Sequence, residues 1–162
     1  GSALPDVSGG FGTTLSWKGL DVAVDFSYQI GGKLYDRTYA AQMGLQRGGI
    51  MHADMRDAWT PQHTATSVPR LQFNDEYMAS MSSRFLASAS YLNLQNINVG
   101  YTVPVNRWWK HIQSVRVYAS ADNVWLWSAR RGMDPRQSIA GASSAEVYAP
   151  VRTISGGVTI NL

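Results

Sequence analysis

The stretch that decides the fold is Leu20–Ile30, which reads LDVAVDFSYQI. Its even positions carry large apolar side chains, whereas its odd positions carry Asp21, Asp25 and small or polar side chains. Strict alternation places these two sets on opposite faces of a β-strand. The stretch has 11 residues, within the roughly 9–11 of a strand that crosses a membrane at a tilt. We therefore predict a strand that lies between an apolar medium and a wet one.

The same period of two residues recurs along the chain, and with it we predict further strands at about 9–17, 91–103, 114–127 and 153–162. Lys18-Gly19 separates the first strand from Leu20–Ile30 and predicts a tight hairpin. Within 91–103 the alternation slips by one position, which predicts a β-bulge near Gln95. Pro104 should end that strand, because proline cannot donate to the ladder.

The lengths of the connections indicate how the strands are oriented. Short connections, at Lys18-Gly19 and about 104–114, alternate with long ones, at about 31–90 and 128–152. Outer-membrane barrels have short periplasmic turns and long external loops, so we expect both long segments to be extracellular. About five strands are predicted, whereas complete bacterial barrels have an even number. We therefore expect an all-β chain that forms the C-terminal strands of a larger antiparallel transmembrane β-barrel.

The long segment 31–90 contains two short helical patterns. Their repeating side chains are spaced by four residues, as in Tyr35, Tyr39 and Met43, and again in Met51, Met55 and Trp59. Long structured loops are mostly functional, and Met and aromatic side chains are enriched at protein interfaces. We interpret these residues as a partner-contact surface. The alternative is that they only pack the loop onto the barrel rim.

Composition and motifs argue against several other classes of function. Charged residues make up 15% of the chain, less than the roughly 25% of soluble domains. The chain has no cysteine, which excludes thiolate chemistry and disulfides. The net charge of +3 is scattered rather than gathered into a basic stripe, so we expect no nucleic-acid partner. No apolar run approaches the ~18 residues of a transmembrane helix.

No catalytic constellation emerges from the sequence. Nucleophile-elbow, P-loop and dinucleotide glycine patterns are missing, so we expect neither an enzyme nor a cofactor. His52, Asp54 and Asp57 could be read as a metal cluster. Such spacing is common on helix surfaces, however, and we predict no metal site.

Most of the tryptophans lie where predicted strands end. We interpret five of them as an aromatic girdle at the two membrane interfaces: Trp17, Trp108, Trp109, Trp125 and Trp127. The alternative is stacking on a sugar. Two rival functions stay open at this point. One is a secreted β-sandwich that binds carbohydrate, and the other is a complete small barrel with a structural or adhesion role.

Several characteristic phrases occur in order along the chain. The most specific runs from Ser90-Tyr91-Leu92 through Asn96-Ile97 to Gly100-Tyr101-Thr102-Val103-Pro104. The others are Gly1-Ser2-Ala3-Leu4-Pro5-Asp6, Gly9-Gly10-Phe11-Gly12, Trp17-Lys18-Gly19-Leu20-Asp21, Gly31-Gly32-Lys33-Leu34-Tyr35-Asp36, Asp57-Ala58-Trp59-Thr60-Pro61, Asp122-Asn123-Val124 and Gly132-Met133-Asp134-Pro135. Together these phrases resemble the SusC/RagA family of TonB-dependent outer-membrane transporters.

The resemblance implies a fold, a function and a set of partners. Barrels of this class have about 22 strands and are plugged, so the chain would be a C-terminal part that lacks the plug. It implies import of a large nutrient, an oligosaccharide or a peptide, across the outer membrane of a Gram-negative bacterium. It also implies four partners: the remaining strands of the same barrel, outer-membrane lipid, a SusD-like surface lipoprotein, and TonB, which would act through the missing N-terminal part.

Overall fold

A computed structural model of the chain describes residues 1–44, 48–73, 75, 77–78, 80–105, 112–129, 132–137, 141 and 148–161. Its main feature is one antiparallel five-stranded sheet with the order β1-β2-β5-β6-β7. These strands are β1 (Val7–Trp17), β2 (Leu20–Ile30), β5 (Tyr91–Pro104), β6 (Ser114–Ser128) and β7 (Thr153–Asn161). Each lies within two residues of a strand predicted from the period-2 alternation, because alternation over nine or more residues specifies a strand well.

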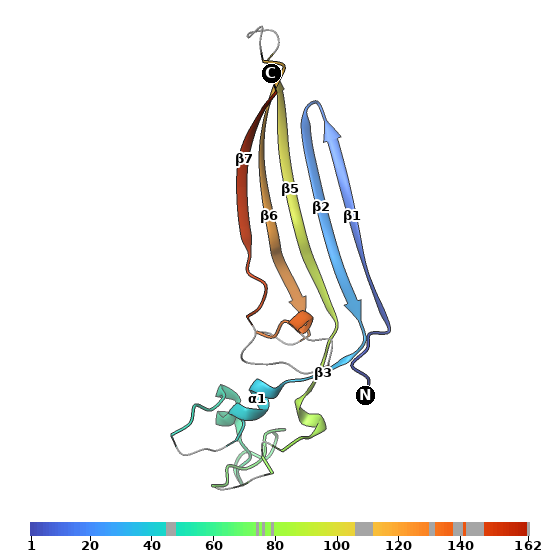
Figure 1. Cartoon of the computed structure of the whole chain (residues 1–162). Coiled ribbons are helices and arrows are strands. Elements are labelled where there is room, and N and C mark those ends of the chain that lie inside the picture. The colour runs from blue at the N-terminus through green and yellow to red at the C-terminus, as the bar shows by residue number, and fades with distance from the viewer. Residues whose placement is uncertain are drawn as a thin grey trace.

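The strands run alternately up and down, so the connections gather at two ends of the sheet (Figure 1). The turn between β1 and β2 lies at the same end as the last residue of β5 and the first of β6. The segments after β2 and after β6 lie at the opposite end, together with the N-terminus. In the β1–β2 turn, both Lys18 (φ 47°) and Gly19 (φ 90°) are left-handed, as a two-residue hairpin of this twist requires.

The predicted bulge in β5 is confirmed. Asp25 pairs with Asn96 and Phe26 pairs with Leu94, so Gln95 has no partner on β2. The extra residue returns Leu94 to the apolar face. A second irregularity lies opposite in β6, where the pairing jumps from Asp122 to Trp125.

The segment between β2 and β5 folds into a small unit beyond the end of the sheet (Figure 1). It has a two-stranded sheet of β3 (Lys33–Tyr35) and β4 (Leu86–Ser88), a short helix α1 (Arg37–Gln42), and the 3-10 helices η1 (Ala53–Asp57) and η2 (Ser83–Phe85). The first predicted helix is present as α1, but it is shorter than the pattern from Tyr35 to Met43 indicated. The second is a single 3-10 turn. A further 3-10 turn, η3 (Pro135–Gln137), follows β6.

Buried apolar side chains gather in this small unit. In the described part of the chain, all of them except Pro135 lie between positions 34 and 89. A cluster of seven of them, which we call the loop core, consists of Ala40, Met43, Met55, Ala58, Val68, Met78 and Phe85. Among the described residues, no helix is long and apolar enough to cross a membrane.

Candidate functional site

One face of the sheet is apolar across all five strands. Phe26 on β2 pairs with Phe11 on β1 and with Leu94 on β5. The rings of Phe11 and Phe26 stack with centroids 4.9 Å apart. Many side chains of this face are more than a third exposed in the described structure, including Val7, Phe11, Leu15, Val99, Tyr101, Val117, Ile154, Val158 and Ile160. Such a large exposed apolar surface marks a contact with lipid or with another protein.

The opposite face is polar and carries interactions between strands. Arg116 on β6 donates to the Asp21 carboxylate on β2, across the intervening strand β5. Gly100 on β5 makes room for this pair, because a Cβ there would lie 2.5 Å from an Arg116 nitrogen and 2.7 Å from an Asp21 oxygen. Asn96 donates to Asp122 at 2.7 Å. The ion pair between Arg116 and Asp21 thus lies on the polar face of the sheet.

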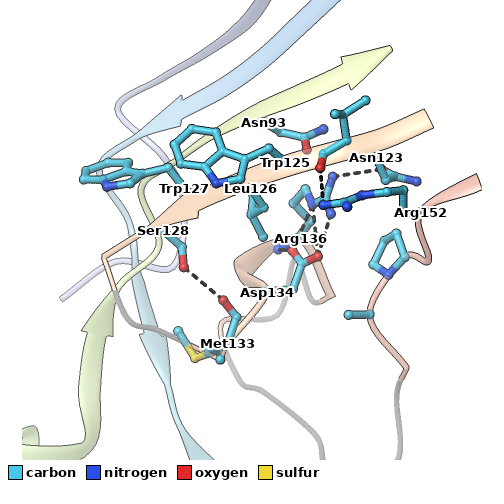
Figure 2. Close-up of a pocket in the computed structure, with 14 residues that line it drawn as sticks. Asn93, Asn123, Trp125, Leu126, Trp127, Ser128, Met133, Asp134, Arg136 and Arg152 are labelled. Carbon is cyan, nitrogen blue, oxygen red and sulfur yellow. Dashed lines mark hydrogen bonds and ion pairs between the residues drawn. The ribbon is translucent and has the colours of Figure 1, made fainter. Parts of the chain in front are cut away.

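A cavity of about 770 Å³ lies at the long-connection end of β6, and we call it the bulge cavity (Figure 2). The irregularity in β6 shapes it, because Asn123 adopts a left-handed φ of 50°, a conformation that Asn tolerates better than most residues. The Asn123 amide donates to the Val151 carbonyl at 3.2 Å. Arg152 donates to the Val124 carbonyl. These contacts fasten the chain just before β7 to β6.

A buried ion pair forms another wall of the bulge cavity (Figure 2). The Asp134 carboxylate accepts from the backbone N and Nε of Arg136 at 2.9 Å each, and from its terminal nitrogen at 2.6 Å. Burial on its own would raise the pKa of Asp134, but the hydrogen bonds and charge of Arg136 outweigh it and hold this pKa below its ordinary value. Arg136 also donates to Asn123 at 3.3 Å, which links the pair to the irregularity in β6.

From the sequence, Asp134 is named only within the phrase Gly132-Met133-Asp134-Pro135, and no role is assigned to Asn93, Arg136 or Arg152. The Asp134-Pro135-Arg136 spacing is the one local signal for the ion pair, because a carboxylate and a guanidinium two residues apart can meet across a turn. The contacts of Arg152 join residues 28 positions apart in the chain, so local spacing could not reveal them.

The residues predicted to contact a partner divide into two groups. Met43 and Met55 belong to the loop core, and Tyr35 and Tyr39 pack against it. Tyr39 also contacts Phe85 edge-on, with ring centroids 5.8 Å apart. Trp59, by contrast, is exposed. Met43 and Met55 are therefore buried inside the loop unit, whereas Met51 is 42% exposed. Contact with a partner and packing onto the barrel rim both stay predictions.

Three of the five predicted girdle tryptophans are described. Trp17 lies at the short-turn end of the sheet, whereas Trp125 and Trp127 lie at the long-connection end. All three are more than half exposed, and the register places them on the apolar face. Trp108 and Trp109 lie outside the described residues.

The histidines in the long segment make pairwise contacts. His52 Nδ1 accepts from the Asp54 backbone at 3.2 Å, and His63 lies 2.7 Å from an oxygen of Asp57. His52, Asp54 and Asp57 are therefore not brought together as one cluster. Within the described part of the chain, no group of three potential ligands could hold a metal ion.

Comparison with known proteins places this geometry in a family. No protein-family profile matches the chain. TonB-dependent receptor P3 of Formosa agariphila is 32% identical over 136 residues, which are 83% of this chain and 13% of that receptor. Receptor P26 of the same organism is 27% identical over 170 residues, 99% of this chain and 17% of that receptor.

Solved structures agree. The RagAB peptide importer in its open-open state superposes with a TM-score of 0.81 at 25% identity, over 99% of this chain and 18% of the solved one. The RagAB peptide transporter gives 0.80 at 26% identity, over 98% of this chain and 18% of the solved one. This chain is a SusC/RagA-like segment of a TonB-dependent receptor. A SusC/RagA-like segment that spans 13% to 18% of its relatives forms an open sheet rather than a closed barrel, and the fold prediction is confirmed.

Proposed function

We propose that this segment forms part of the wall of an outer-membrane, TonB-dependent importer of large nutrients, either oligosaccharides or peptides. The observation that carries the proposal is the division of the five-stranded sheet into an apolar face and a polar face. In a transmembrane barrel the first contacts lipid and the second lines the interior. The edges of β1 and β7 would pair with the remaining strands of the barrel, because unpaired backbone groups are costly in lipid.

The proposed orientation places the long-connection end outside the cell and the short-turn end in the periplasm. Long external loops and short periplasmic turns are usual in such barrels. Trp17 would then mark the periplasmic interface, and Trp125 and Trp127 the external one. Trp108 and Trp109 would complete the girdle. TonB would supply energy through other parts of the receptor.

A SusD-like surface lipoprotein is the proposed partner of the segment 31–90. The likeness to RagAB supports this pairing. The surface of the segment supports it as well, because Ile50, Tyr77 and Met81 are each at least 85% exposed and Trp59 is exposed beside the loop core. Apolar and aromatic side chains of this kind are enriched at protein interfaces.

Uptake by the complete receptor tests the proposed function. A strain that lacks the receptor should lose growth on its nutrient, and the reintroduced gene should restore growth only when TonB is present. Growth that persists without TonB would overturn the proposal.

Co-purification tests the partner. Ile50→Ser with Met81→Ser should reduce the lipoprotein recovered per folded barrel. The control is Ile154→Ser on the apolar sheet face, which should leave recovery unchanged. Equal recovery with both variants would refute the loop as the contact surface.

A further inference from the structure

The described lining of the bulge cavity combines a cation without a carboxylate partner, an unmet hydrogen-bond acceptor and an apolar wall. Asn93 pairs with Leu126 in the register, so the side chains of both residues lie on the polar face of the sheet. This is the side of the sheet on which we place the cavity. Under the proposed function this side is the interior of the barrel. The inference below rests on that proposal.

Among the described lining residues, Arg152 is the cation that has no carboxylate partner. Its partner among the described residues is a backbone carbonyl oxygen, that of Val124. The nearby carboxylate of Asp134 is already engaged by Arg136 through both of its oxygens. The described lining of the cavity therefore has an excess of one positive charge, and a guanidinium with unused donors suits a carboxylate.

The unmet acceptor is Asn93. Its side chain is only 2% exposed, and Oδ1 has no hydrogen-bond partner in the described structure. The other end of the amide donates weakly to Ser27 at 3.4 Å. A buried acceptor without a donor is destabilising by itself, so a ligand that brings an N–H group to this wall of the cavity would gain from it.

We propose that the bulge cavity is a subsite for the C-terminal end of a short peptide. The peptide carboxylate would pair with Arg152, and an N–H near it would donate to Asn93 Oδ1. The final side chain would contact the apolar wall of Leu126, Met133 and Pro150. An acidic sugar has a carboxylate too, and Trp125 and Trp127 are among the residues that line the cavity. The peptide is the proposed occupant because it carries an N–H group next to its carboxylate, which matches an acceptor, Asn93 Oδ1, beside a cation, Arg152.

Binding of paired peptides to the complete receptor, purified with its lipoprotein, tests the subsite. The probes are a pentapeptide with a free C-terminal carboxylate and the same peptide as an amide, measured by calorimetry. The free acid should bind about tenfold more tightly, the scale of one charge-assisted hydrogen bond. Arg152→Gln should remove this difference, and Arg152→Lys should partly restore it. Arg70→Gln is the matched control, because it removes one exposed positive charge outside the cavity lining and should preserve the difference.

Asn93→Leu separates the second contact from the first. It should weaken the acid and the amide equally, because both peptides keep the donating N–H. The amount of folded barrel must be equal for all variants compared. It is measured by the change in electrophoretic mobility when the sample is heated. Equal affinity of acid and amide for the wild type, or an unchanged difference in Arg152→Gln, would overturn the subsite. So would Arg152-dependent binding of an oligouronate by a receptor that binds no peptide. Those results would leave importer function standing, since TonB-dependent uptake measures it separately.

Discussion

The five-stranded sheet and the segment 31–90 belong to one chain but bury their apolar side chains in opposite ways. The sheet exposes Phe11, Leu15 and Val158, whereas the segment encloses Met43 and Phe85 almost completely. A folded unit in water must hide its apolar surface from the solvent. A sheet in lipid has no such need, and its backbone pairing is what must be complete. The contrast indicates that one chain is adapted to two solvents, the sheet to lipid and the segment 31–90 to water.

The largest effect is expected from a cavity in the loop core. Met43→Ala removes a fully buried side chain, with 0% exposed, and should destabilise the loop unit by about 2–5 kcal/mol. The matched control is Met81→Ala, because Met81 is 87% exposed in the same segment. Hydrogen exchange of the complete receptor should show faster exchange across 34–89 for Met43→Ala alone, while the strands keep their protection. Loss of protection in the strands as well would show that loop and sheet fold as one unit.

The next effect concerns the two faces of β1. Thr13 pairs with Val24 on the apolar face, and its neighbour Thr14 pairs with Ala23 on the polar face. Thr13→Arg should destabilise the assembled barrel by about 2–4 kcal/mol if the site lies near the bilayer midplane. Thr14→Arg introduces the same residue into a hydrated interior and should cost much less. Denaturant titration of the receptor in lipid compares them, and equal costs would break the distinction between the faces.

A smaller effect is expected at the connection before β7, where Asp134 anchors the chain. Asp134→Asn leaves Arg136 without its carboxylate and should weaken local packing by about 1–3 kcal/mol. Asp54→Asn is the control, because that side chain is about half exposed, at 49%. Hydrogen exchange of residues 132–137 should rise in the first variant and stay unchanged in the second. Similar exchange in both would show that the ion pair does not anchor this segment.

The smallest effect is a dependence on pH. Because the folded pKa of Asp134 lies below its ordinary value of 3.8, its contribution to stability is fully present above pH 3.8 and is lost as pH falls through the lower, folded value. Exchange at 132–137 should therefore rise only under strongly acidic conditions, and this rise should be missing in Asp134→Asn. A transition near neutral pH would point to another group.

Sequence reasoning worked where a period repeats over many residues. The strand β2 and the bulge at Gln95 follow from alternation and from one slip in it. The strands β3 and β4 could not be found, because three residues carry no measurable period. The spacing of Met51, Met55 and Trp59 imitates a helix, yet the chain forms only the 3-10 helix η1 there, and Met55 alone of the three is buried in the loop core.

The bulge cavity was beyond sequence reasoning for a different reason. Arg152 and Val124 meet only after β6 and β7 pair, and the side chain of Asn93 is buried by the same assembly. Nothing in the local sequence distinguishes these residues from other polar side chains in strands and loops. The tryptophans at the strand ends, by contrast, were found directly, because a strand end is visible in the alternation.

The most direct test of the two-solvent account is the labelling of neighbouring cysteines on β2. The chain contains no cysteine of its own, so Val24→Cys and Asp25→Cys introduce single thiols on the apolar and the polar face. In intact outer membranes, a water-soluble thiol reagent should label position 25 and spare position 24, while a membrane-soluble reagent should reach position 24. Equal labelling of both positions by the water-soluble reagent would contradict the assignment of the apolar face to lipid.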